Sequence, residues 1–335
     1  MCAEKKPVVA ITLGDPAGIG PEITVATMMD KEVYNECYPF LIGSTAIIER
    51  AMRIQGCDFP VNKISHPREA KFSWGSLDVL DTGDYDCDNI RWGKVQQLAG
   101  KMSLDYVMKS IELGMEGAID VVSTAPIHKE AIKLAGCKLP GHTEIYQVET
   151  GSDYGLTMFH VQNLRVFFVS RHMPLKDACD YAYKERVLAC VEQIYHEFTG
   201  LNIPQPRIAV AALNPHASDN GLFGHEEADN LIPAVKAAQE MGINAIGPVP
   251  ADSVFHLGKL GKYDAILSLY HDQGHIACKT LDFERSVTIT FGLPFIRSSV
   301  DHGTAFDIAG TGKAGTVSML ESTLVAARYW KMKHQ

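Results

Sequence analysis

Short apolar runs rich in β-branched residues alternate along this chain with longer segments that have helical periodicity. Continuous apolar runs of this kind are typical of strands that helices cover on both faces. The pattern therefore predicts an α/β fold whose sheets are mainly parallel. The expected strands are Val8–Thr12, Tyr38–Ile42, Ala118–Ser123, Leu164–Ser170, Arg207–Leu213, Ala265–Tyr270 and Ser286–Thr290. The clearest expected helices are Lys94–Glu116, Leu175–Phe198 and Glu226–Met241, and Gly303–Ala327 is expected to hold a loop and a helix.

The composition limits the possible partners. The chain has 335 residues, and 31 basic against 40 acidic side chains give it a net charge of −9. Such a charge argues against a nucleic acid or an anionic membrane as partner. An anionic substrate would have to be held by a few local cations inside a cleft. The length predicts one large domain or two closely joined domains.

The first residues and the cysteines indicate where the protein works. We find neither a secretory signal nor an apolar stretch long enough to cross a membrane. The eight cysteines show no CxxC pairing, and scattered single thiols fit a reducing compartment. We therefore expect a cytoplasmic protein.

A glycine-rich segment, residues 14–22 with the sequence GDPAGIGPE, follows the first expected strand. Open α/β sheets bind ligands at the carboxyl ends of their strands. Pro21 suits the first turn of a following helix, whose N–H groups could hold an anion. The alternative is a tight structural turn. The glycine spacing is not that of a Rossmann nucleotide loop.

Three histidines, His172, His216 and His271, each follow a different expected strand. A single histidine is more often structural than a ligand. Three at equivalent strand ends would converge on one crevice if the strands are neighbours. Neutral imidazoles suit Zn²⁺, Co²⁺, Ni²⁺ or Fe²⁺, and three ligands leave positions for a substrate.

Other loops contribute polar and cationic side chains. His142 and Thr143 follow a glycine turn, while Lys279 and Arg297 are candidate holders of a phosphate or carboxylate. Asp252 is a candidate acid or base. Taken singly, each of these charges is more often a solvated surface group.

Several of these segments occur together, in order, and resemble the 4-hydroxythreonine-4-phosphate dehydrogenase family of pyridoxal phosphate biosynthesis. The resemblance covers the chain from about Val8 to about Gly315. It rests on residues 14–22, the Pro-Gly-His-Thr-Glu loop at 140–144, Leu-Asn-Pro-His at 213–216, Pro-Ala-Asp at 250–252, Tyr-His-Asp-Gln-Gly at 270–274 and the segment DHGTAFDIAG at 301–310. The first and last segments also resemble parts of isocitrate and isopropylmalate dehydrogenases.

The resemblance implies a two-domain isocitrate/isopropylmalate dehydrogenase-like fold with the active cleft between the domains. It further implies an obligate homodimer whose cleft is completed across the interface. One domain would comprise residues 1–125 plus 286–335, with the glycine-rich and cofactor loops. The other, residues 126–285, would carry the metal ligands and the dimer interface.

The resemblance also implies roles for individual residues. Carried over to this chain, the metal ligands are His172, His216 and His271, and the substrate contacts are His142, Thr143, Lys279, Thr288 and Arg297. The cofactor loop contributes Gly303, Thr304, Asp307 and Gly310, and Asp252 or Lys279 is the catalytic acid or base. The implied cofactors are NAD or NADP and one divalent metal (Zn, Co, Mg, Mn or Ni).

Two departures concern the substrate. Thr288 stands where the biosynthetic enzymes have Asn, and residues 274–276 (Gly-His-Ile) look closer to a second branch of the family. That branch is linked to catabolism of D-threonate or D-erythronate 4-phosphate.

We therefore expect NAD(P)-dependent and metal-dependent oxidation and decarboxylation of a small 4-phosphorylated 3-hydroxy acid. A three-histidine zinc hydrolase would explain the histidines, but not Lys279, Arg297 or the 302–310 loop. A non-catalytic phosphometabolite-binding protein would need neither the metal nor the nucleotide loop.

Overall fold

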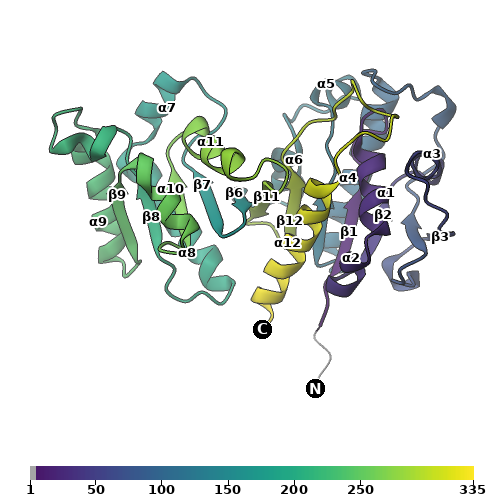
Figure 1. The fold of residues 1–335 in the computed structure, drawn as a ribbon, viewed down its shortest axis with the longest axis horizontal. Coiled ribbons are helices and arrows are strands. Elements are labelled where there is room, and N and C mark those ends of the chain that lie inside the picture. Colours follow the sequence, from purple (N-terminus) through teal and green to yellow (C-terminus); the bar gives the residue numbers. More distant parts are fainter. Residues whose placement is uncertain (1–4) are drawn as a thin grey trace. The chain divides into compact units, whose positions relative to one another are not determined.

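The computed structural model describes residues 5–335, which divide into two compact units. The first unit comprises the chain up to Gly155 together with Val287–His334. The second comprises Leu156–Ser286. Figure 1 shows strands and covering helices in each.

The first unit is built on strands in the order β3-β4-β2-β1-β5-β12-β11. Neighbouring strands pair in parallel, except that β11 and β12 are antiparallel. Val9, Ala10 and Ile11 of β1 are fully buried, as expected for a central strand covered on both faces. The strands are β1 Val8–Thr12, β2 Tyr38–Ile42, β3 Val61–Ile64, β4 Leu77–Leu80, β5 Val121–Thr124, β11 Val287–Phe291 and β12 Ile296–Val300.

Helices pack against these strands: α12 against β12 and β5, and α4 against β1. In Figure 1 the yellow α12 runs beside the purple N-terminal elements. The helices of this unit are α1 Gly20–Met29, α2 Lys31–Glu36, α3 Thr45–Gln55, α4 Gln97–Met115, α5 Lys129–Leu134, α6 His142–Glu149 and α12 Val317–Lys333. Short 3₁₀ turns lie at η1 Pro67–Glu69 and η2 Cys87–Asn89.

The second unit has strands in the order β6-β7-β10-β8-β9. All neighbours are parallel except the hairpin β6–β7. The strands are β6 Leu156–Val161, β7 Leu164–Phe168, β8 Ile208–Ala211, β9 Ala245–Val249 and β10 Ala265–Ser268. The helical elements are α7 Leu175–Tyr181, α8 Lys184–Gly200, η3 Pro215–Asp219, η4 Glu227–Leu231, α9 Ile232–Glu240, α10 Ala251–Lys259 and α11 His271–Leu281.

The predicted α/β class with mainly parallel strands is confirmed. Each of the seven expected strands exists, and two have the predicted bounds: Val8–Thr12 and Tyr38–Ile42. Strands β3, β4, β6, β9 and β12 were not expected. Four of the five have four or five residues and little apolar length to signal them.

Two expected helices are interrupted. The predicted helix 175–198 breaks where Tyr183 is extended, and the next helix starts with the Lys184 N–H donating to the Asn230 side chain at 3.2 Å. The predicted helix 226–241 begins as a π-helical turn, η4, before α9. Both departures depend on contacts between segments far apart in the chain.

The compact units divide at Gly155 and at Ser286, whereas the sequence predicts boundaries at residues 125 and 285. Residues 126–155 stay with the first unit because α5 and α6 pack on α4. The Ser110 and Tyr146 hydroxyls hydrogen bond at 2.5 Å, which joins α4 to α6. No motif in the sequence marks these contacts.

Among residues 5–335, no helix combines the length and apolar character needed to pass through a bilayer.

The α4–α5 contact gives a test of the packing. A Cβ on Gly100 would lie 1.9 Å from the Ala131 carbonyl oxygen, whereas one on the helical Gly200 would meet nothing within 4 Å. We expect Gly100→Ala to lower the free energy of unfolding by about 2–3 kcal/mol, because backbone must move. Gly200→Ala should leave it unchanged or raise it by up to about 1 kcal/mol. Urea unfolding measures both, and equal effects would contradict the packing described.

Candidate active site

The three histidines expected to bind a metal follow three adjacent parallel strands. His172 comes after β7, His271 after β10 and His216 after β8, and β10 pairs with both β7 and β8. Parallel neighbours end at the same edge of a sheet. The three histidine loops can converge only if these strands are neighbours, and they are.

Two of the three rings lie close together. The His172 and His271 ring centroids are 6.0 Å apart. The His275 ring stacks on that of His271 at 3.7 Å, and the His271 Nδ1 and an Asp272 carboxylate oxygen are 2.6 Å apart. Burial raises the cost of charging His275 and lowers its pKa to about 4. Within residues 5–335, no group of three or more His, Cys, Asp or Glu side chains is arranged to hold a metal ion.

His216 lies on a strained loop. Residues 216–220 all have positive φ, between 45° and 63°, and none of them is glycine. Each such residue costs on the order of 1 kcal/mol, and such strain collects at functional sites. His216 is exposed at the start of this run. The backbone therefore fixes its direction at a cost that the neighbouring contacts must offset.

A buried carboxylate supplies those contacts. Glu227, which is 1% exposed, accepts hydrogen bonds from the Leu213 and Asn214 backbone N–H groups at 2.9 and 2.7 Å. Its other oxygen accepts from the Asn214 side chain at 2.9 Å. Glu227 begins the π-helical turn η4, a distortion often found at functional sites. It holds the segment that leads into His216.

Gln273 joins the loops that carry His216 and His271. Its side-chain oxygen accepts from the Leu269 N–H at 2.8 Å and from the Ser268 hydroxyl at 3.0 Å. Its amide nitrogen donates to the Ala212 carbonyl at 2.8 Å. Neither Gln273 nor Glu227 was predicted as a site residue; Gln273 lies within the recognised segment 270–274, whereas Glu227 lies outside every recognised segment.

Two of the expected substrate contacts, His142 and Thr143, lie in the first unit beside a third, Arg297, which is 3% exposed on β12. Its guanidinium donates to three threonine hydroxyls: Thr143 at 3.3 Å, Thr290 at 3.1 Å and Thr124 at 3.0 Å. It also lies 5.5 Å from the Tyr146 ring centroid. Arg297 and Thr143, each predicted as a substrate contact, therefore lie in contact with each other. Thr124 and Thr290 were not predicted as site residues.

His142 shares this cluster. Its Nε2 is buried and has no hydrogen-bond partner among the described residues. Burial, and secondarily the charge of Arg297, lower the pKa of His142 well below the usual value for histidine. The imidazole is therefore neutral at physiological pH, and a ligand could bond to Nε2.

The other expected polar residues lie at scattered positions. Thr288, on β11, donates to the Ser299 carbonyl at 3.3 Å. Lys279 is half-buried on α11, with its Nζ 5.2 Å from the Phe283 ring centroid. Asp252 is exposed in the first turn of α10. Helix α10, whose first turn contains Asp252, contacts η3, the turn that contains His216.

The glycine-rich turn at 14–22 is a structural turn rather than an open anion site. Residues 11–25 are buried throughout. The Ala17 N–H donates to the Asp15 carboxylate at 2.8 Å and the Ile19 N–H to the Thr304 carbonyl at 3.0 Å. Pro21 stands in the first turn of α1, as predicted. These N–H groups are therefore already hydrogen-bonded within the protein.

The segment expected to bind the cofactor packs directly on that turn. A Cβ on Gly18 would lie 2.9 Å from the Thr304 Cβ, and the Phe306 ring stacks on His128 at 4.7 Å. Gly303 and Asp307 are exposed, whereas Thr304 is 8% exposed. The loop thus has buried anchor residues and exposed residues that a ligand can reach.

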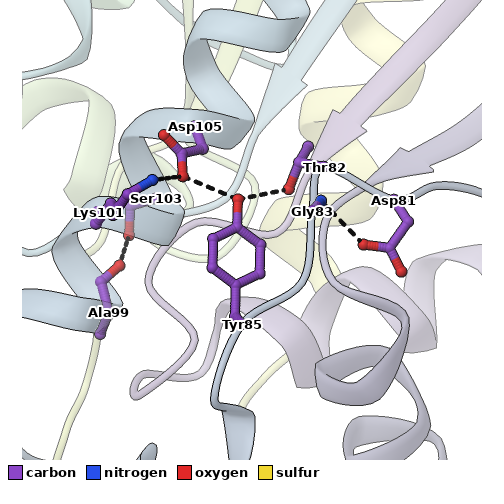
Figure 2. A network of polar contacts seen from close by, with 8 residues as sticks. All are labelled: Asp81, Thr82, Gly83, Tyr85, Ala99, Lys101, Ser103 and Asp105. Carbon is purple, nitrogen blue, oxygen red and sulfur yellow. Dashed lines mark hydrogen bonds and ion pairs between the residues drawn. The ribbon is translucent and has the colours of Figure 1, made fainter.

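A cavity of about 940 Å³ in the first unit lies elsewhere. Figure 2 shows its polar network, in which the Tyr85 hydroxyl donates to Asp105 at 2.9 Å and meets the Thr82 hydroxyl at 3.1 Å. Lys101 pairs with the same carboxylate at 2.5 Å. None of the predicted site residues lines this cavity, and the side chains of Thr82, Tyr85, Lys101 and Asp105 in its lining bond to one another.

Comparison with known proteins finds relatives that match most of the chain. The profile of the family described as "Pyridoxal phosphate biosynthetic protein PdxA" matches residues 35–326. A protein of Clostridium botulinum named "Putative D-threonate 4-phosphate dehydrogenase" is 48% identical over 97% of both chains.

Two solved structures are also similar over almost the whole chain. The 4-hydroxythreonine-4-phosphate dehydrogenase of Klebsiella pneumoniae has a TM-score of 0.89 and 38% identity, covering 97% of this chain and 99% of its own. The one from Burkholderia phymatum has a TM-score of 0.87 and 40% identity, with 97% and 98% covered.

These likenesses define the class of protein as a dehydrogenase, an oxidoreductase. The chain belongs to the PdxA family. The resemblance inferred from the ordered segments is thereby confirmed.

The environment of His142 gives a test of this site. Because burial is the main cause of its lowered pKa, we expect the His142 ring to stay neutral through the pH range in which an exposed histidine becomes charged. Arg297→Met should raise the pKa of His142 only in part, since it removes the smaller cause. Histidine NMR shifts followed against pH measure both, and titration of His142 near pH 6.5 in the wild type would contradict the geometry.

Proposed function

We propose that this protein oxidises and decarboxylates a four-carbon 3-hydroxy acid phosphorylated at C4, with NAD or NADP as hydride acceptor and one divalent metal ion. The leading substrate is D-threonate 4-phosphate or D-erythronate 4-phosphate. The observation that carries the proposal is the buried Arg297, held by three hydroxyls beside the neutral Nε2 of His142. A fixed guanidinium with a neutral imidazole suits a phosphate or carboxylate oxygen.

The hydroxy-acid substrate is supported by the Clostridium botulinum relative and by Thr288. That relative carries the D-threonate 4-phosphate name. Thr288 has no amide to bond to a substrate amino group, and its hydroxyl donates to the Ser299 carbonyl. The second candidate is 4-hydroxythreonine 4-phosphate, favoured by the solved relatives of that name.

The chemistry of the donors supports the metal. Three imidazoles suit a borderline divalent ion, and the centroids of the His172 and His271 rings lie 6.0 Å apart. We propose His216 as the third ligand, with Glu227 fixing the loop that presents it. Bound there, a metal would lower the pKa of the C3 hydroxyl and stabilise the charge that develops as CO₂ leaves.

We assign each predicted site residue a part in the reaction. Arg297 and Lys279 bind anionic groups, and Thr143 and His142 orient the substrate beside Arg297. When bound, the nucleotide would accept the hydride as the C3–H bond breaks, while the hydroxyl proton leaves to a base. That base is Asp252, Lys279 or water. The resulting 3-keto acid loses CO₂ from C1, and a proton replaces it at C2.

The nucleotide is assigned to the 303–310 segment. Gly303 is exposed, and a Cβ placed on it would meet nothing within 4 Å. The exposed Asp307 offers a carboxylate to ribose hydroxyls, as acidic residues do in other dinucleotide sites. We assign Gly303, Thr304, Asp307 and Gly310 to this role.

We also propose that the protein forms a homodimer and works in the cytoplasm. Exposed apolar side chains in the second unit, at Leu260, Ile276 and Phe283, are of the kind that a subunit contact covers. The cysteines from Cys37 to Cys278 are free thiols, which supports a reducing compartment.

Absorbance of the reduced nicotinamide tests the reaction. Purified protein with a divalent metal and NAD or NADP should give a signal with a 4-phosphorylated C4 hydroxy acid. Chelation or His216→Ala should reduce it by at least about a thousandfold, because three ligands act as a unit. The matched control His196→Ala, in a side chain 81% exposed, should keep full activity. Full activity of His216→Ala after stringent chelation would refute the metal proposal.

A substrate panel tests the choice of acid. D-threonate and D-erythronate phosphates should give a higher kcat/KM than 4-hydroxythreonine 4-phosphate. The reverse order would favour the second candidate, and no signal with any of them would contradict the proposed function.

Arg297→Lys tests the anion site. Lysine cannot keep the planar set of bonds to three threonines. We expect KM for the phosphorylated acid to rise by about ten- to a hundredfold, with KM for the nucleotide unchanged. Arg328→Lys, at an exposed 3.7 Å ion pair, is the control and should alter neither. An unchanged substrate KM in Arg297→Lys would exclude the proposed role.

A further inference from the structure

We propose that Glu22 is a positioning residue that fixes residues 304–312 in the shape that binds the nicotinamide nucleotide. This inference rests on the proposed function. Glu22 itself is fully buried, so its effect on the nucleotide would pass through the loop.

The contact joins segments far apart in the chain. Glu22 stands in the first turn of α1, and its two carboxylate oxygens accept hydrogen bonds from the backbone of the loop. Oε1 accepts from the Gly310 N–H, and Oε2 accepts from the Gly312 N–H at 2.9 Å. One carboxylate therefore holds two amides of the same loop.

The two glycines make this arrangement possible. Gly310 has a φ of +81° and Gly312 a φ of +70°, a conformation that glycine adopts without strain. A Cβ on Gly310 would also lie 2.7 Å from the Trp92 ring. The loop turns its N–H groups toward Glu22 only because these positions carry no side chain.

The charge makes the contact strong. An ionised carboxylate is costly to bury unless hydrogen bonds compensate it. Here two backbone donors do so, and the positive end of the α1 dipole adds to them. Loss of one bond would leave a buried donor or acceptor unsatisfied, so the loop has no low-cost alternative position.

A second attachment lies at the other end of the loop. The Ile19 N–H, one turn before Glu22, donates to the Thr304 carbonyl at 3.0 Å. Asp307 lies exposed between the two attachments, and Gly303 lies exposed beside the first. The start of α1 thus sets the position of the residues proposed to meet the nucleotide.

The test compares Glu22→Gln with wild type and with Glu36→Gln. The side-chain amide that Glu22→Gln introduces would keep one acceptor and place an N–H₂ group against the second backbone N–H. Glu36 is a matched control in the same unit, since its carboxylate binds the Lys331 ammonium at 2.8 Å and not the loop. Three quantities are measured: hydrogen exchange of the Gly310 and Gly312 amides, nucleotide binding by calorimetry, and KM for each substrate.

We expect slow exchange of both amides in the wild type and in Glu36→Gln. In Glu22→Gln exchange at these amides should rise by about ten- to a hundredfold, the value of one bond to a charged group. The nucleotide Kd and KM should rise by a similar factor, while KM for the phosphorylated acid stays within about twofold. Glu22→Asp, which keeps the charge on a shorter side chain, should lie between.

Other outcomes would overturn the inference. Fast exchange of the Gly310 and Gly312 amides in the wild type, measurable even if no Glu22 variant folds, would show that the anchor is not there. Nucleotide binding unchanged in Glu22→Gln would show that the anchor does not serve the nucleotide. A wild type that binds no NAD or NADP at all would remove the proposed function, and this inference with it.

Discussion

Parallel strand pairing is the constraint on which the rest of this structure depends. When neighbouring strands run the same way, the loops that follow them emerge at one edge of the sheet. In the second unit, the order β7-β10-β8 brings the loops of His172, His271 and His216 to that edge. In the first unit, the loop after β1 is the buried turn on which the 303–312 segment rests. Chemistry collects at these edges because the connections there are free to vary while the sheet stays rigid.

Buried charges do much of the positioning. Glu22 holds the backbone of the 310–312 segment, Glu227 holds the segment before His216, and Arg297 is held by three threonine hydroxyls. The two carboxylates accept hydrogen bonds from amide N–H groups, and the guanidinium donates to hydroxyl oxygens. A carboxylate that accepts from two backbone amides acts as a clamp on that stretch of chain.

Strain accompanies this positioning. Five successive non-glycine residues with positive φ follow Pro215, next to the π-helical turn that contains Glu227. Strained backbone persists only when surrounding contacts over-determine it. Here Glu227 and Gln273 supply those contacts. Their hydrogen bonds go to Asn214 and Ala212, just after β8, and to Leu269, just after β10. The exposed His216 thus lies on a loop whose positive φ angles lower the free energy of unfolding.

The sequence by itself determined the fold class, because apolar runs and helical periodicity are local patterns that follow from how side chains meet a sheet or a helix face. It also determined the family, because the segments that carry it lie in order along the chain. The family resemblance named Arg297 and Thr143 as separate substrate contacts, and the tertiary structure brought them together. Tertiary structure alone decided what the glycine-rich turn does. Its N–H groups turn inward, and the Glu22 carboxylate binds the backbone of Gly310 and Gly312, far along the chain. It likewise decided that residues 126–155 join the first unit and that Thr124, Glu227 and Gln273 hold the site. Hydrogen bonds between distant segments leave no periodicity in a sequence, so only folding reveals which polar residue meets which.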